Sequence, residues 1–448
     1  MTNLTFKLIL WSVVAFAMVA SRASWATAQN AVPGATQSKP VALVGGTLHP
    51  MSGDKIEDGT IVFADGKITA IGADVELPKK VKKISIKGKH VYPGLFEAHS
   101  QMGLTELAAV RASVDTSETG ELNPNAKAVS SVNPENIIIP VTRANGVLLA
   151  LSAPSGGLVS GQAAVLQLDG WTYEDMAVKS SAVMQVNWPS QTLSPRRARR
   201  MSKEEIKEYK ETQLKNLRGI RKLFDQARAY RDLRVSSPDD QAFDLRLEGM
   251  VPVVNGELPM LVRADRAAEI QSAVTFAVEQ EVKIIILGGY DAEQCAALLK
   301  KHDVPVIVSA VFRLPQRTDD GFDRSYTLPK RLQKAGVKYC ISGTDRSRTW
   351  NARILPYHAG TAVAYGLDQE EAMRAITLYP AQILGVDDRV GSLEIGKDAT
   401  LIVTDGTPLE TFTRTEQAFI GGRKVDLTSK HFQLYKKYEQ RAKQLKAK

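Results

Sequence analysis

The chain is poor in the residue types that most often carry metal or nucleophilic chemistry, with six histidines and two cysteines among 448 residues. His99 stands near the end of a segment with strand character, two positions before Gln101. Side chains at positions i and i+2 of a strand point the same way, so this pair can meet one ion or ligand. A neutral glutamine amide is a weak ligand for zinc, which prefers histidine, cysteine and carboxylate groups.

The other five histidines are poorly placed to complete such a site. His49 and His90 belong to a region of short strands, and His431 lies in the C-terminal tail. His302 ends a predicted helix just before a strand, which is the wrong end of a strand–helix repeat. His358 lies on a predicted helix, where a core or surface histidine is the commoner role.

A glycine-rich stretch from Ser155 to Gly161 has the composition of loops that hold phosphate. It lacks the Lys-Ser/Thr ending of a phosphate-binding loop. The flanking segments, 146–153 and 163–168, are apolar enough to be buried strands. A tight connection between two strands is therefore the favoured interpretation.

The N-terminus has the pattern of a secretory signal peptide. Lys7 precedes an apolar run from Leu8 to Ala20, and Ala26-Thr27-Ala28 offers a cleavage site before Gln29. The run is shorter than the roughly 20 residues that cross a bilayer. Residues 1–28 are therefore predicted to be removed, leaving an exported, periplasmic or extracellular chain without a transmembrane segment. A membrane anchor is the alternative.

Composition describes an ordinary globular protein, with 44% hydrophobic and 24% charged residues. The formal charge of +9 is concentrated in two segments: residues 196–234 hold 14 basic and 6 acidic residues, and residues 430–448 hold 7 and 1. Such segments can contact anionic lipid or cell-wall polymer, although solvated helix faces are the commoner explanation. No nucleic-acid-binding motif occurs in the sequence, so nucleic acid is not an expected partner. Cys295 and Cys340 are either two buried thiols or one disulfide.

Short predicted strands follow a flexible lead-in at 29–40, and Asp65-Gly66 between alternating apolar runs is a strong hairpin signal. From about residue 259 strands and helices alternate, which predicts a parallel sheet, open or closed into a barrel. A helix over about 202–230 carries an apolar stripe that should pack on this barrel. Strands at 400–403 and 418–420 are too few to fold alone and should complete the N-terminal β region. The last helices before them are expected around 352–365 and 369–384.

Two stretches resemble the amidohydrolase superfamily, particularly its imidazolonepropionase-related exported branch. The first is Val91-Tyr-Pro-Gly-Leu-Phe-Glu-Ala-His-Ser-Gln101, which stands where the family has Pro-Gly, two apolar residues and Asp-x-His-x-His. The second runs from Ser342-Gly-Thr-Asp345 through 372–381 to 390–399. The resemblance implies an α/β fold in which a (β/α)8 TIM-type barrel, with its site at the C-terminal strand ends, is inserted into a small composite β-sandwich domain. The expected division is a signal peptide at 1–28, a lead-in at 29–40, the sandwich at 41–93 and 386–427, the barrel at 94–385 and a basic helix at 428–448.

The resemblance also implies metal-dependent chemistry with a degenerate site. In the family, one or two divalent ions, typically zinc, activate a water that attacks a C–N centre. His99 matches the first histidine of the motif, and Asp345 matches the aspartate that follows the last barrel strand. Gln101, Arg263 and Gly288 stand where the family has its other histidines, on the first, fifth and sixth strands. A catalytic zinc takes three protein ligands, so zinc is expected to be absent or weakly held here.

One hypothesis follows for the replaced positions: Arg263 points at Asp345, and its guanidinium fills part of the volume of the family's metal. The alternative is an Arg263 turned outward to solvent. Two functions stay open for the whole chain. One is an exported hydrolase of non-peptide or dipeptide C–N bonds, with His99 and Asp345 as catalytic residues. The other is a catalytically inactive barrel used for binding or scaffolding. A small-molecule ligand and a homo-oligomer are compatible with both.

Overall fold

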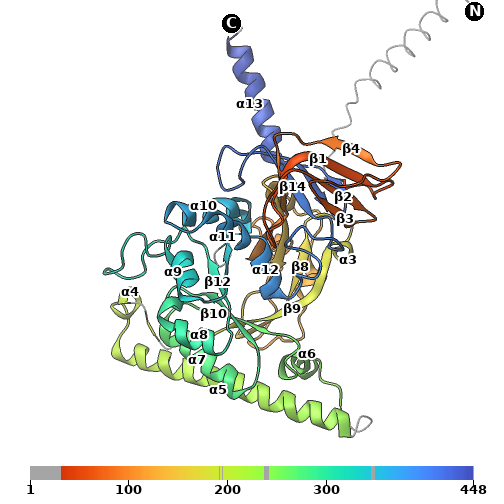
Figure 1. Cartoon of the computed structure of the whole chain (residues 1–448). Coiled ribbons are helices and arrows are strands. Elements are labelled where there is room, and N and C mark those ends of the chain that lie inside the picture. Colours follow the sequence, from red (N-terminus) through yellow and green to blue (C-terminus); the bar gives the residue numbers. More distant parts are fainter. Residues whose placement is uncertain (1–31, 191, 194, 237–241, 345–348, 447–448) are drawn as a thin grey trace, which may run out of the picture. The chain divides into compact units, whose positions relative to one another are not determined.

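The computed structural model of the chain (Figure 1) describes residues 32–190, 192–193, 195–236, 242–344 and 349–446. The predicted signal peptide and Asp345 lie outside the described residues. Every element below belongs to the unit that begins at Pro33. Within the described ranges, no helix is both long enough and apolar enough to cross a membrane.

One of two eight-stranded sheets forms the barrel, in the order β13-β12-β11-β10-β9-β8-β7-β6. Neighbouring strands are parallel except at β8, which runs antiparallel to both β7 and β9. The glycine-rich stretch returns the chain directly from β7 to β8, and a connection without a crossover helix can only join antiparallel strands. The expected TIM-type barrel is therefore modified at one strand. The strands are β6 (Leu95–Ser100), β7 (Val147–Ser152), β8 (Val159–Gln167), β9 (Ala177–Asn187), β10 (Met260–Ala264), β11 (Ile284–Gly288), β12 (Val306–Ser309) and β13 (Tyr339–Ser342).

Side chains alternate between the two faces of this sheet, as strand geometry requires. Leu261 and Leu287 belong to the cluster inside the barrel, together with residues of helix α12. Val262 and Ile286 belong to the outer cluster, which packs against the surrounding helices. Those helices are α7 (Ala267–Glu279), α8 (Ala296–Lys301), α9 (Leu328–Ala335), α10 (Leu355–Ala364), α11 (Gln369–Arg374) and α12 (Leu378–Leu384).

The two edge strands of the barrel sheet meet through a connecting segment. Ile341 of β13 donates a backbone hydrogen bond of 2.9 Å to the Ala375 carbonyl, and Phe96 of β6 donates one of 2.8 Å to the Ile376 carbonyl. The prediction of a single helix over 369–384 is wrong, because the chain leaves the helical conformation between α11 and α12. The carbonyl groups of the break pair with the sheet edges instead of continuing a helix.

The long basic helix α5 (Lys203–Ser236) buries its second half. Ile220, Phe224 and Ala227 are almost fully buried, whereas Ile206 and Tyr209 are only partly covered. The predicted apolar stripe therefore packs mainly toward its C-terminal end, where α6 (Leu245–Val254) lies alongside. Lysines and arginines occupy the exposed face, as an amphipathic helix requires.

The second sheet combines strands from both ends of the described chain, in the order β16-β15-β14-β5-β1-β2-β3 with β4 beside β1. Antiparallel pairing of β14 with β5 joins strands from the two halves in this one sheet. Asp65 and Gly66 connect β2 to β3 with positive φ angles of 49° and 80°, as the hairpin signal predicts. Its strands are β1 (Val41–Leu48), β2 (Ile56–Ala64), β3 (Lys67–Gly72), β4 (Lys82–Ser85), β5 (His90–Pro93), β14 (Leu401–Thr404), β15 (Thr415–Ile420) and β16 (Arg423–Val425).

The two cysteines are free thiols, which decides between the two alternatives left open by the sequence. Cys340 lies on β13 inside the barrel, and Cys295 lies at the start of α8. Both are buried, and burial raises the pKa of each thiol. They contribute apolar packing rather than a crosslink.

Candidate functional site at the mouth of the barrel

The barrel mouth gathers four of the five residues predicted for the site. His99 belongs to β6 and Gln101 follows it, Arg263 belongs to β10, and Gly288 ends β11. All four stand at the C-terminal ends of parallel strands, which meet at one edge of the sheet. Asp345 follows β13, but it lies outside the described residues, so its pairing with Arg263 stays a prediction.

His99 is a neutral, buried imidazole. Its side chain is 4% exposed, and its Nδ1 atom has no hydrogen-bond partner among the described residues. Burial and the nearby positive charge of Arg263 lower the pKa of His99 to about 3. A neutral imidazole with an unpaired nitrogen retains the capacity to bind an ion or to accept a proton.

Gln101 is held against the glycine-rich connection. Its Nε2 donates to Ser155 Oγ at 2.9 Å, and its backbone N–H donates to Thr349 Oγ1 at 3.2 Å. The side chain is almost fully buried, so this amide hydrogen bond has no competing water from bulk solvent. Gln101 therefore fixes the loop after β7.

Glu97 joins the two edge strands of the barrel sheet. Its Oε2 accepts from the Gly343 backbone N–H at 2.9 Å, and its Oε1 accepts from Ser342 Oγ and from the His99 N–H at 3.3 Å. The residue is fully buried, and burial raises the pKa of Glu97 to about 8 despite these bonds. When Glu97 is protonated on Oε1, the direction of its hydrogen bond with Ser342 reverses: Oε1–H donates to Ser342 Oγ, and Ser342 Oγ donates to the His99 carbonyl at 3.2 Å. At neutral pH this carboxyl group is therefore mainly protonated.

Arg263 faces the inside of the barrel mouth. It stands two residues after Leu261 of the interior cluster, and side chains two residues apart on a strand share a face. Arg263 also lines a cleft of about 610 Å3. Its charge acts on both His99 and Asp265. This half-buried position favours the inward orientation over an Arg263 turned outward to solvent. Other cleft residues come from the end of β9 and the start of α7, including Asn187, Trp188, Arg266 and Ala268.

Asp265 and Arg313 form an ion pair that the sequence interpretation missed. The two guanidinium nitrogens of Arg313 donate to the two Asp265 oxygens at 2.9 and 3.0 Å. Gly288 has φ +107°, and a Cβ atom there would lie 2.6 Å from Asp265 Oδ1. The space beside β11 is therefore occupied by this carboxylate. The spacing of Arg263 and Asp265 could have indicated that both side chains lie on one strand face at the mouth. Nothing in the sequence identifies Arg313 as the partner of Asp265.

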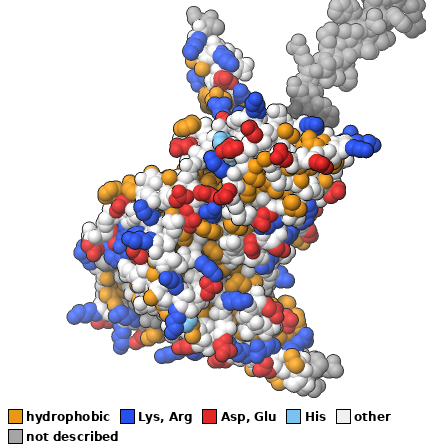
Figure 2. Space-filling view, viewed as in Figure 1, with side chains coloured by type: hydrophobic (Ala, Val, Ile, Leu, Met, Phe, Trp, Pro, Cys, Tyr) orange, Lys and Arg blue, Asp and Glu red, His pale blue; other side chains and the backbone are white. Residues whose placement is uncertain are grey.

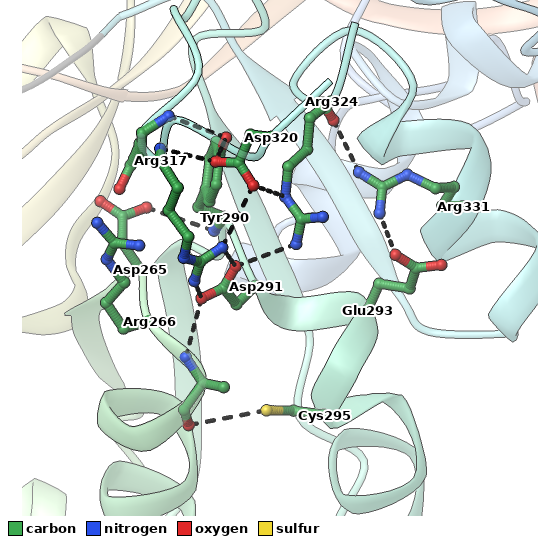
Figure 3. Close-up of polar contacts among 12 residues, drawn as sticks. Asp265, Arg266, Tyr290, Asp291, Glu293, Cys295, Arg317, Asp320, Arg324 and Arg331 are labelled. Atoms are coloured by element: carbon green, nitrogen blue, oxygen red, sulfur yellow. Dashed lines mark hydrogen bonds and ion pairs between the residues drawn. The ribbon is translucent and has the colours of Figure 1, made fainter. Parts of the chain in front are cut away.

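The segment between β12 and α9 is tied to the mouth by further ion pairs, shown in Figure 3. Arg317 and Arg324 both contact the buried carboxylate of Asp291, and Arg324 Nη2 lies 3.2 Å from it. Asp320 accepts a 2.6 Å hydrogen bond from the Tyr290 hydroxyl. The Arg317 and Arg324 guanidinium groups also lie over the Tyr290 ring, 5.9 and 5.3 Å from its centroid. This segment is consequently fixed over the ends of β10 and β11.

The described side chains at the mouth do not fit a standard divalent metal centre. His99 is a suitable ligand, but the Gln101 amide donates to Ser155, Arg263 is cationic, and Gly288 has no side chain. Across the described ranges no three histidine, cysteine, aspartate or glutamate side chains are grouped closely enough to hold an ion. The metal-ligand role predicted for Asp345 lies outside those ranges.

Of the remaining histidines, His358 lies close to the mouth, because its Nδ1 accepts from the N–H of Phe312, the neighbour of Arg313, at 3.3 Å. The others lie elsewhere in the fold. His302 follows α8 and lines a separate cleft of about 1090 Å3 among the N-terminal strand ends. His358 is buried on α10, where the Phe312 ring lies 4.0 Å away and burial lowers the pKa of His358 to about 4. His49 and His90 contact each other within the second sheet, and His431 contacts Arg353.

The α/β barrel carries a polar cleft at its C-terminal strand ends and adjoins a sheet with strands from both ends of the described chain. The amidohydrolase family model matches residues 281–425. That stretch includes Gly288 and Asp345, whereas His99, Gln101 and Arg263 lie outside it. The chain is therefore similar to amidohydrolases in sequence over its C-terminal third.

Individual relatives agree with this assignment. A crystal structure of an amidohydrolase from Thermotoga maritima MSB8 superposes with a TM-score of 0.76 at 25% identity, covering 86% of this chain and 99% of that one. "Amidohydrolase tasK" of Hapsidospora irregularis is 24% identical over 400 residues, which is 82% of this chain and 39% of that protein. An imidazolonepropionase of Syntrophobacter fumaroxidans is 34% identical over 84 residues, 18% of this chain and 20% of that enzyme. The chain thus matches well under half the length of these two relatives.

Proposed function

We propose that this chain is an exported member of the amidohydrolase family whose barrel mouth binds a small anionic molecule, in place of the family's metal centre. The fold, the family match and the predicted signal peptide support the first part. The replacement of histidine by Gln101, Arg263 and Gly288 supports the second. In this proposal the binding role, rather than hydrolysis, is the function that persists.

The charge balance of the mouth cleft carries the proposal. Three acidic residues line the cleft. Asp265 is paired with Arg313 and Asp291 with Arg317, whereas Glu269 accepts hydrogen bonds from Ser190 Oγ and from the Asp265 and Arg266 N–H groups. Hydrogen bonds from Arg313 lower the pKa of Asp265, although burial opposes its ionisation. Arg263 and Arg266 line the same cleft. Together with Arg313 and Arg317 they make four arginines against three carboxylates, Asp265, Glu269 and Asp291, so the cleft carries one excess positive charge.

The chemistry of these groups favours a ligand that bears a carboxylate. A guanidinium is always charged and presents a planar fork of donors that matches a carboxylate in two parallel hydrogen bonds. Trp188 lines the cleft and offers an apolar surface to the rest of such a molecule. A volume of about 610 Å3 suits a small organic acid.

A second candidate function is hydrolysis of non-peptide or dipeptide C–N bonds, and one observation favours it. His99 is neutral and buried, and its Nδ1 has no hydrogen-bond partner among the described residues, as expected of a metal ligand or proton acceptor. The relatives' names are those of amidohydrolases and related enzymes. In this case His99 and Asp345 would hold a divalent ion, which would supply an activated water.

Metal content and ligand binding of the purified chain separate the two candidates. We expect less than stoichiometric zinc or manganese, and calorimetric binding of N-acyl amino acids that Arg263→Gln weakens at least tenfold. Arg246→Gln is the matched control, because Arg246 is exposed on α6 and lines no cleft described above. Near-stoichiometric metal that disappears in His99→Ala, together with C–N bond hydrolysis, would instead establish the second candidate. Binding that is equally weak in both arginine variants would overturn the first.

A further inference from the structure

The C-terminal helix α13 (Lys430–Lys446) has no packing role in the described fold. None of its residues is buried, in contrast to α5, which buries five. Its polar contacts include one between Arg353 Nη1 and His431 Nδ1 at 2.8 Å and hydrogen bonds from the Phe432 and Gln433 N–H groups to the preceding Ser429, at 3.3 and 3.0 Å. A helix of 17 residues without tertiary burial is marginal in water, so its sequence pattern calls for another explanation.

Three of the five large apolar residues of α13 share one helix face. Leu434, Tyr438 and Leu445 follow one another at spacings of four and seven, which places them on a single helix face. Tyr435 lies beside them, and Phe432 precedes them. These five side chains are between 42% and 62% exposed, which is a concentration of exposed apolar surface within 14 residues.

The rest of the helix is strongly basic. Residues 430–446 contain six lysines and arginines and one acidic residue, Glu439. Lys436 and Lys443 both contact Glu439, at 3.4 and 3.6 Å, so the single acid is already matched within the helix. Figure 2 shows basic and hydrophobic side chains together on this helix. Its outer surface therefore carries a net positive charge around an apolar stripe.

We propose that α13 binds the surface of an anionic phospholipid bilayer. A basic amphipathic helix with aromatic residues lies in the plane of a membrane interface, with its apolar face in the acyl boundary and its lysines against lipid phosphates. Tyr435 and Tyr438 suit that boundary, because one end of a tyrosine is apolar and the other is polar. Leu434 and Leu445 supply the apolar contacts.

A second copy of the same helix is a poorer match for this face. Arg441 lies on the same helix face as Leu434, Tyr438 and Leu445, and Lys437 lies beside it, without an acidic residue on that face. Two such helices laid face to face would bring like charges together, whereas coiled-coil partners place opposite charges at these positions. The charge pattern thus complements lipid phosphate rather than another copy.

Vesicle sedimentation of the full chain tests this proposal. We expect binding to vesicles of phosphatidylglycerol and phosphatidylcholine, and none to phosphatidylcholine alone. The triple variant Lys437→Gln, Arg441→Gln and Lys446→Gln should bind roughly 100-fold more weakly, since each basic residue near an anionic surface contributes about a fivefold gain. The variant Leu434→Ser, Tyr438→Ser and Leu445→Ser should lose binding even at low salt.

The matched control removes the same charge from the exposed face of α5, through Lys210→Gln, Lys215→Gln and Lys222→Gln. The proposal requires this control to bind vesicles as the parent does, with all variants retaining the parent's melting temperature. Equal losses in the α5 and α13 charge variants would overturn it, because the attraction would then belong to the overall charge. Concentration-dependent dimerisation abolished by the apolar variant, without vesicle binding, would show that a second copy covers α13.

Discussion

Glu97→Gln should change the pH dependence of stability more than any exposed acidic substitution. The carboxyl group of Glu97 is fully buried at the junction of β6 and β13, and burial raises its pKa from 4.5 to about 8. Between these two values the folded chain keeps a proton that the unfolded chain releases. The stabilising effect of that proton is complete below pH 4.5, declines as the pH rises, and is lost above pH 8.

The size of the effect follows from the two pKa values. A shift of this size corresponds to a limit of about 5 kcal/mol, at roughly 1.4 kcal/mol per pH unit. Between pH 5 and pH 9 the free energy of unfolding should therefore fall by about 4 kcal/mol because of Glu97 alone. A glutamine has no such proton to lose, so this decline should be absent from the variant. Its amide must face either the Gly343 or the His99 N–H, which costs about 1 kcal/mol at every pH.

Urea unfolding at pH 5, 6, 7, 8 and 9 measures this difference directly. We expect the variant to be slightly less stable than the parent at pH 5 and more stable at pH 9. Glu208→Gln on α5 is the control, because Glu208 is exposed and its substitution should leave the pH profile unchanged. A stability difference between parent and Glu97→Gln that stays within about 1 kcal/mol across this range would refute the reasoning.

Three other substitutions test separate features of the fold. Arg143→Met should lower the free energy of unfolding by about 2–3 kcal/mol, because Asp169 would lose its buried 2.7 Å partner and keep Arg423 at 3.3 Å; urea unfolding measures this, and a loss under 1 kcal/mol would contradict it. Gly288→Ala should cost about 1–3 kcal/mol, because φ is +107° and its Cβ would meet Asp265, whereas Gly53→Ala, which meets nothing within 4 Å, should leave the melting temperature unchanged. Asp291→Asn should release the arginine-rich segment before α9 and speed its cleavage by trypsin several-fold; an unchanged digestion pattern would show that Asp291 does not hold it.

The sequence predicts the barrel and the composite sheet well because their signals are local and repeated. Apolar runs with turn residues between them identify the strands, and Asp65-Gly66 identifies a hairpin whose two positive φ angles only a few residue types adopt. The break at Ala375 and Ile376 carries no such signal. These residues have ordinary helix propensity. Their carbonyl groups leave the helix because they accept hydrogen bonds from N–H groups on the edge strands β6 and β13.

The mouth of the barrel is less predictable because its contacts join residues far apart in the chain. The positions of His99, Arg263 and Gly288 at one sheet edge follow from strand geometry. Arg313 belongs to an irregular segment, 48 residues after Asp265, and no periodicity places its side chain against that carboxylate. The role of Glu97 is equally hidden, since a glutamate in a strand is expected to face solvent unless a partner is known.

Under the proposed function, the replaced positions of the mouth depend on one another. Gly288→His would restore a side chain of the family type, but its Cβ would stand 2.6 Å from Asp265 Oδ1. Moving Asp265 would leave Arg313 without its two hydrogen bonds, and a positive charge from Arg263 would still oppose a cation beside His99. Gln101→His would in turn release Ser155 and the connection after β7. Single reversions should therefore lower stability without creating metal affinity, and only a combined change at Gln101, Arg263, Asp265 and Gly288 could reverse the replacement.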